Sequence, residues 1–148
     1  EDSFQVLRGY QAGMADHGVA IDPAWIFTRN EASADKCGEA LRQWLEMPEA
    51  IRPTAALSDN NHGAAGLYAE AARHGLEVPK DLSICSIGNN YDEYAHLTPA
   101  LTSYYAPRED VGRYAVESLI NIIEGGDPKD YRTPVPHHFI EGGSVKRL

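Results

Sequence analysis

Two stretches decide the fold, TAALSDNN at residues 54–61 and SICSIGNN at residues 83–90. Each opens with a short apolar run, which is typical of a buried strand, and each ends in a cluster of polar side chains. In an open α/β sheet, ligands bind in the crevice beyond the carboxyl ends of the strands. The pattern therefore predicts a binding site lined by Asp59, Asn60, Asn89 and Asn90.

The rest of the chain alternates between helices and short strands. Gly18 and Gly75 are expected to end two of the helices, because glycine readily adopts the left-handed conformation of a helix C-terminus. We expect the strand at residues 54–58 to be covered on both faces. The alternation predicts an α/β fold with a doubly wound, mainly parallel sheet. Apolar spacing places the helices at residues 4–17, 34–47, 61–74 and 108–124, and the strands at residues 25–28, 54–58, 83–87, 101–105 and 137–140.

Composition narrows the class of protein. The chain has 148 residues, 43% of them hydrophobic, which is typical of one soluble globular domain. Its net charge of −9 argues against contact with nucleic acid by these residues, because phosphate binding needs a basic face. Cys37 and Cys85 form no CxxC pair and no apolar run reaches transmembrane length, so we expect a reduced, cytoplasmic protein with no membrane partner.

The chemistry of the polar clusters points to binding. The sequence has no GxSxG, HExxH, P-loop or GxGxxG motif, so we expect no enzyme activity, no cofactor and no metal site. Amides and carboxylates supply donors and acceptors that suit sugar hydroxyls or the edge of a nucleobase. A purely structural interpretation is equally open, in which Asn60 or Asn61 caps a helix and Asn89-Asn90 turns the chain.

Several motifs, in their order and spacing, resemble the LacI/GalR family of bacterial transcription regulators. The resemblance covers nearly the whole chain. It rests on PTA at residues 53–55, DNN at 59–61, GLEVPKDLS at 75–83, LTPALT at 97–102, Pro107, Gly112, and LRGY at 7–10.

The resemblance implies an effector-binding core shaped like a type I periplasmic sugar-binding protein, with one of its two lobes largely present. Residues 1–106 would form the C-terminal lobe, whose first helix and strand would precede Glu1. Residues 107–130 would supply a helix to the other lobe. Residues 131–148 would return to the first lobe as a strand and tail.

The resemblance also assigns roles to residues. Asn60 matches the family's effector-contacting Asn, and Asn89 (or Gly88, counting forward from Asp81) matches the first Asp of a sugar-binding pair. The chain departs from the family in three places. Asn61 replaces an Asp, Asn89-Asn90 replaces the Asp pair, and Val6 replaces an Arg that often contacts the effector.

The implied partners are a small-molecule effector, a second copy and DNA. The effector would be a sugar or related polyol, and DNA would be contacted only through an N-terminal head. The homodimer would form through Gly63, Ala64, Tyr68 and the loop from Asp92 to His96. The alternative is a periplasmic sugar-binding protein of a transport system, which shares the fold.

Overall fold

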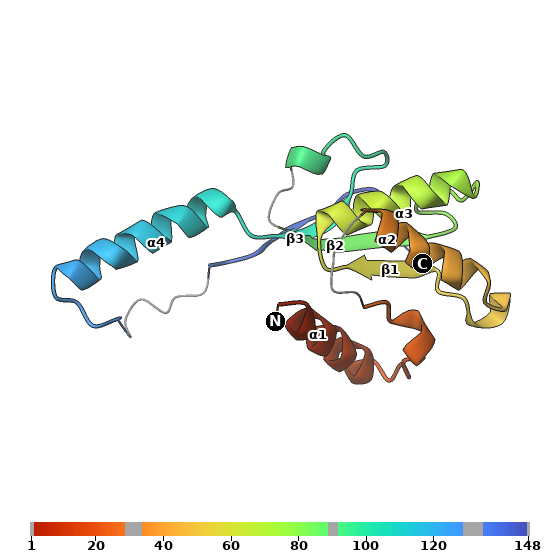
Figure 1. The fold of residues 1–148 in the computed structure, drawn as a ribbon, viewed down its shortest axis with the longest axis horizontal. Helices are drawn as coiled ribbons and strands as arrows, with labels where there is room; N and C mark the ends of the chain where they lie inside the picture. The colour runs from red at the N-terminus through yellow and green to blue at the C-terminus, as the bar shows by residue number, and fades with distance from the viewer. Residues whose placement is uncertain (1, 29–33, 89–91, 129–134, 148) are drawn as a thin grey trace.

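A four-stranded sheet forms the centre of the fold. The computed structural model describes residues 2–28, 34–88, 92–128 and 135–147. The strands lie in the order β1-β2-β3-β4, with β1, β2 and β3 parallel and β4 antiparallel to β3, which confirms the predicted mainly parallel α/β sheet (Figure 1). Their bounds are Ala55–Ser58, Ser83–Gly88, Thr102–Tyr105 and His138–Ile140.

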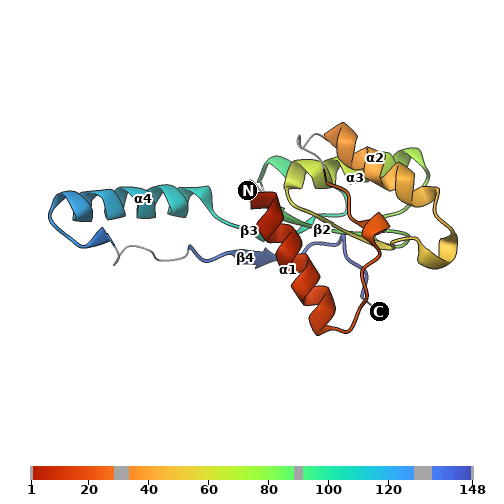
Figure 2. The same cartoon turned by 60° about the horizontal axis from the view of Figure 1, so that its bottom comes forward.

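Helices α2 (Ala34–Leu45) and α3 (Asn61–Arg73) cover one face of this sheet (Figures 1 and 2). Their apolar stripes meet the inward residues of β1 and β2. The loops before β2 and β3 complete the core. Gly75, with φ of +69°, follows α3 as predicted, because the left-handed conformation ends the helix there. The buried apolar residues are Ala40, Leu41, Trp44, Ala56, Ala64, Leu67, Ala71, Leu82, Ile84 and Leu101.

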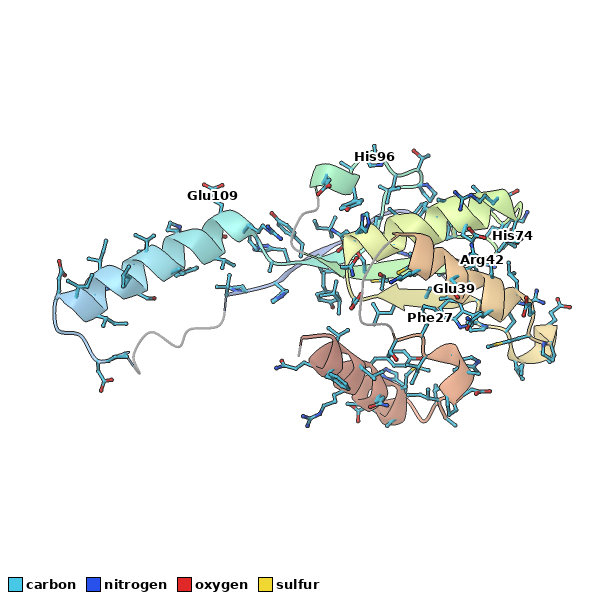
Figure 3. The ribbon with its side chains drawn as sticks, viewed as in Figure 1. Phe27, Glu39, Arg42, His74, His96 and Glu109 are labelled. Carbon is cyan, nitrogen blue, oxygen red and sulfur yellow. The ribbon has the colours of Figure 1, made fainter. Side chains whose placement is uncertain are left out.

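A buried carboxylate joins α2 to α3. Glu70 of α3 is buried and pairs with Arg42 of α2 at 2.9 Å, and with Arg73 and His74 at 2.9 and 3.1 Å. Figure 3 labels Arg42 on α2 and His74 at the end of α3. Hydrogen bonds from Arg42 and Arg73 lower the pKa of Glu70 to about 2. Gly38 allows the helices to approach, because a Cβ there would lie 3.1 Å from Glu70 Oε2.

The other face of the sheet is largely open. Helix α1 (Asp2–Asp16) lies on this side (Figures 1 and 2). Leu57, Tyr104 and Phe139 nevertheless remain 43%, 50% and 55% exposed. The prediction that β1 is covered on both faces is therefore wrong: its residues alternate between exposed and buried, because within the described ranges only α2 and α3 pack closely on the sheet.

The predicted strand at residues 25–28 is also wrong. A short 3-10 helix, η1 (Pro23–Trp25), stands at its start, and residues 26–28 pair with none of the strands in the described part of the chain. Asp22 caps η1 by accepting a 2.9 Å hydrogen bond from the backbone N–H of Ala24. An apolar run needs a neighbouring strand to complete its backbone hydrogen bonds, and sequence does not reveal whether one is present.

Helix α4 (Arg108–Ile123) extends away from the sheet (Figure 1). It contains no buried residue. The chain leaves the sheet through β3 and returns through β4, so both connections run side by side at the pair Tyr105 and His138. The assignment of α4 to a second lobe remains a prediction. Its exposed large apolar residues are Val111, Tyr114, Val116, Leu119, Ile120, Ile122 and Ile123.

The segment after β4 ties β2 to β3. The Ser144 side chain is fully buried, and its hydroxyl donates to the Ile84 carbonyl at 2.5 Å and accepts from the Thr102 N–H at 2.8 Å. The Ser144 carbonyl in turn accepts from the Ile84 N–H at 2.8 Å. One residue therefore satisfies buried backbone groups of two strands.

Candidate functional site

The turn between β1 and α3 carries the first pair of predicted site residues. Asn60 has extended backbone angles, and its Oδ1 accepts a 2.7 Å hydrogen bond from the Gly63 N–H, so it is the N-cap of α3. Its Nδ2 donates to Asp59 Oδ1 at 2.8 Å. Ser58 stiffens the turn by donating from Oγ to the Asn60 carbonyl at 2.7 Å.

The geometry of this turn limits what it can offer a ligand. The side-chain carbonyl of Asn60 is committed to the helix cap, so the cap interpretation from the sequence is correct. An amide nitrogen carries two protons, and Asp59 takes one of them, which leaves Asn60 a donor for a ligand. The Asp59 side chain is exposed and supplies carboxylate acceptors. The turn can thus both donate to and accept from a hydroxyl group.

The second predicted cluster, Asn89 and Asn90, lies outside the described residues. Gly88, the last described residue before this cluster, ends β2 at the same edge of the sheet as Asp59 and Asn60, because β1 and β2 are parallel and Ser58 pairs with Ser86. Effector binding by all four residues remains a prediction.

Asn61 is a buried polar residue that sequence reasoning considered only as a cap. It is 3% exposed and reaches from the first turn of α3 onto the sheet. Its Oδ1 lies 2.5 Å from Ser86 Oγ and 3.2 Å from Ser103 Oγ, and the two hydroxyls lie 3.0 Å apart. Ser86 and Ser103 pair across β2 and β3 and are fully buried. The available sequence signal for this buried cluster was Ser86, a serine on the inward face of the otherwise apolar strand β2.

The structure corrects the predicted dimer surface. Ala64 is 0% exposed, and it packs in the core with Leu67 and Ala71. Gly63 is also buried, and a Cβ there would lie 2.5 Å from Ser58 Oγ and 2.8 Å from Cys37 Sγ. Neither residue can contact a second copy, because both face their own lobe. Tyr68 is half-buried and donates from its hydroxyl to the Pro99 carbonyl at 2.8 Å.

The exposed side of α3 carries a different set of residues, which lie at helical spacing: His62, Ala65, Ala69 and Ala72, of which Ala65 is partly buried. This side adjoins η3 (Asp92–Tyr94), because His62 Nδ1 and the Tyr94 hydroxyl form a 3.1 Å hydrogen bond and their rings meet edge to face. Partial burial, together with the nearby Glu93 carboxylate, raises the pKa of Tyr94.

The two thiols are poor nucleophiles. Burial, with the nearby Asp59 carboxylate, raises the pKa of Cys37, and burial raises the pKa of Cys85. Both cysteines are free. The described residues contain no group of three or more His, Cys, Asp or Glu side chains that could hold a metal ion. Within those same ranges, no helix is long and apolar enough to cross a membrane.

Comparison with known proteins supports the resemblance seen in the sequence. Residues 1–145 match the family described as periplasmic binding protein-like domain. The chain is 33% identical over 119 residues to the HTH-type transcriptional repressor CytR of Escherichia coli K12. This match covers 80% of the chain and 34% of the repressor, so the chain spans about a third of the length of this curated relative.

Solved structures share the fold. A regulatory protein of the LacI family from Chloroflexus aggregans superposes with a TM-score of 0.85 at 27% identity, covering 95% of this chain and 49% of that one. A LacI family regulator from Arthrobacter sp. FB24, solved in complex with lactose, gives 0.69 at 25% identity, covering 78% and 42%. The fold is thus that of one lobe of a periplasmic-binding-protein-like domain. The chain belongs to the periplasmic binding protein-like domain family, in the form found in LacI/GalR-type transcription regulators.

Proposed function

We propose that the chain is the effector-sensing and dimerisation portion of a LacI/GalR-like transcription regulator. In the intact protein it would bind a sugar or related polyol between two lobes, and binding would change how a dimer presents its separate heads to operator DNA in the cytoplasm. The matched relatives bear the names of transcriptional repressors and regulators, which does not favour the transport alternative and fits a protein that is not an enzyme.

The observation that carries the proposal is the position of the Asp59–Asn60 turn. It lies at the carboxyl end of β1 in a parallel sheet, where ligands of such sheets bind. The turn offers an amide donor beside an exposed carboxylate, and that pairing suits the vicinal hydroxyls of a sugar. The lactose complex of the Arthrobacter regulator is consistent with this class of ligand.

A thermal-shift screen of the intact regulator against sugars, polyols and nucleosides tests the proposal. A ligand at about 100 times its Kd should stabilise the protein by ~2.7 kcal/mol. The Asn60→Asp variant, which keeps the helix cap but loses the amide donor, should lose half or more of the shift. Asn121→Ala is the matched control, because Asn121 is exposed on α4, away from the turn. If no compound of these classes raises the melting temperature, the proposed sensing role is wrong.

The proposed dimer surface is the exposed side of α3 with the adjoining loop that ends at His96. The family resemblance places the interface on this helix and loop, and burial of Gly63 and Ala64 leaves Ala69 near its centre. Ala69→Arg should therefore shift the intact protein toward monomer in sedimentation velocity. Ala50→Arg, an exposed alanine in η2 (Glu49–Ile51), should stay dimeric. A dimeric Ala69→Arg protein would place the interface elsewhere.

A further inference from the structure

Asn61 links the candidate site to two strands distant in sequence. It directly follows the Asp59–Asn60 turn, and its hydrogen-bonding partners Ser86 and Ser103 lie 25 and 42 residues away. We propose that Asn61 is a positioning residue that fixes the turn against β2 and β3. The inference deepens the proposed function and rests on it, since the turn is where the effector would bind.

Proton accounting shows why a side-chain carbonyl suits this place. Each serine hydroxyl has one proton to donate. The shortest contact assigns the Ser86 proton to Asn61 Oδ1, at 2.5 Å. The Ser103 proton can go to Asn61 Oδ1 at 3.2 Å, to Ser86 Oγ at 3.0 Å or to the Tyr104 carbonyl at 3.3 Å. Without the Asn61 carbonyl, Ser86 Oγ would have to donate to Ser103 Oγ at 3.0 Å and Ser103 Oγ to the Tyr104 carbonyl at 3.3 Å, so the 2.5 Å bond to Asn61 Oδ1 would be replaced by longer ones.

Steric fit makes the placement specific. Gly88 ends β2, and a Cβ at this position would lie 2.5 Å from Asn61 Cγ. That separation is too short for any real side chain, so the Asn61 amide occupies the space that a larger residue at position 88 would need. The amide is therefore held by hydrogen bonds from one side and by the β2 backbone from the other.

Among the described residues, the side-chain hydrogen bonds of Ser58 and Asn60 within the turn are local. Asn60 Oδ1 bonds the Gly63 N–H three residues on, and Ser58 Oγ bonds the Asn60 carbonyl two residues on. Such bonds shape the turn, and the pairing of Ser58 with Ser86 places only the end of β1 relative to β2. Loss of the Asn61 carbonyl should consequently loosen the first turn of α3 more than the rest of the helix.

Amide hydrogen exchange of the 148-residue chain tests this local effect without any ligand. In Asn61→Ala, the Gly63 N–H should exchange at least about tenfold faster relative to the Ala71 N–H, equivalent to ~1.4 kcal/mol of local opening. In Asn61→Asp, a carboxylate oxygen accepts the same hydroxyl protons and should restore most of the Gly63 protection. Leu67→Ala is the control for general destabilisation and should accelerate both amides equally.

Equal acceleration of both amides in Asn61→Ala would show a purely structural role and overturn the proposal. A double-mutant cycle gives a second measurement, by urea unfolding. Gly88→Ala should destabilise the parent strongly but the Asn61→Ala protein much less, because the clash disappears. Additive effects would also overturn the inference. Since neither experiment needs an effector, a failed ligand screen would count against the proposed sensing role and not against the positioning role.

Discussion

Asn60 combines a structural and a proposed binding role that substitutions can separate. Its Oδ1 caps α3 through the Gly63 N–H at 2.7 Å, while its Nδ2 donates to Asp59 Oδ1 at 2.8 Å and is the group proposed to donate to a ligand. Asn60→Ala removes both groups, so the free energy of unfolding should fall by about 1 kcal/mol, the usual cost of a lost N-cap. For a chain of this length this corresponds to a drop in melting temperature of roughly 2–4 °C.

Asn60→Asp keeps an oxygen at the cap position but has no amide proton to donate. Its free energy of unfolding should fall less than that of Asn60→Ala, because Asp and Asn are equally good N-caps, and the remaining loss comes from the carboxylate that replaces the amide donating to Asp59 Oδ1. Urea titration monitored by circular dichroism measures both variants, and the cap effect should change the midpoint without changing the slope. Against a sugar from the thermal-shift screen, both variants should bind about 10- to 100-fold more weakly by calorimetry, equivalent to ~1–3 kcal/mol.

Two results would refute this reasoning. An Asn60→Ala protein as stable as the parent would mean that the cap bond contributes nothing. An Asn60→Asp protein with full sugar affinity would mean that the Asn60 amide does not donate to the ligand. Stability should thus distinguish the two variants while affinity should not, and this crossed pattern is difficult to obtain from a general folding defect.

Three other predictions concern the lobe itself. The folded state favours ionised Glu70, because the pKa of Glu70 is lowered from 4.5 to about 2. The stability that ionised Glu70 gives the folded protein should therefore be complete above about pH 4.5 and vanish as the pH falls toward 2. Glu70→Gln should therefore be less stable than the parent at pH 7 and should lose less stability between pH 4.5 and 2. Urea unfolding at several pH values measures this, and a parallel loss of stability in both proteins would contradict it. Leu67→Ala should lower the free energy of unfolding by about 2–5 kcal/mol because it leaves a cavity in the core, whereas Leu67→Met should lower it by less than ~1.5 kcal/mol. Equal losses for the two variants in chemical denaturation would argue against tight packing around Leu67. Tyr68→Phe should cost about 1 kcal/mol by removing the hydrogen bond to Pro99, whereas Tyr104→Phe, at a half-exposed residue, should change stability by less than about 0.5 kcal/mol in the same assay.

Sequence reasoning succeeded where the signal was local. Apolar spacing and the stop at Gly75 located α3, and the short apolar runs located β1 and β2. Ala64 is instructive, because its spacing with Leu67 and Ala71 places it on the apolar face of the helix, whereas the family resemblance implied a dimer contact. The spacing proved correct, since α2 covers that side of α3.

Sequence reasoning failed where the outcome depended on distant parts of the chain. Residues 25–28 had the composition of a strand, but strand formation needs a neighbouring strand. Asn61 was recognised as a cap candidate, yet its contacts with Ser86 and Ser103 join three separate elements. No pattern within a single element shows which buried serine faces which amide.

The buried bonds of Ser144 have a consequence for the order of folding. Ser144 and Ile84 are 60 residues apart, and the chain between them includes β3, α4 and β4. Closing so long a loop is entropically expensive and gains nothing until the contact forms. Refolding should therefore assemble β1, α3 and β2 before residues 142–146 dock. Until then, the amides of Ile84 and Thr102 have no native acceptor, so pulse labelling of these two amides would time the last step of sheet assembly.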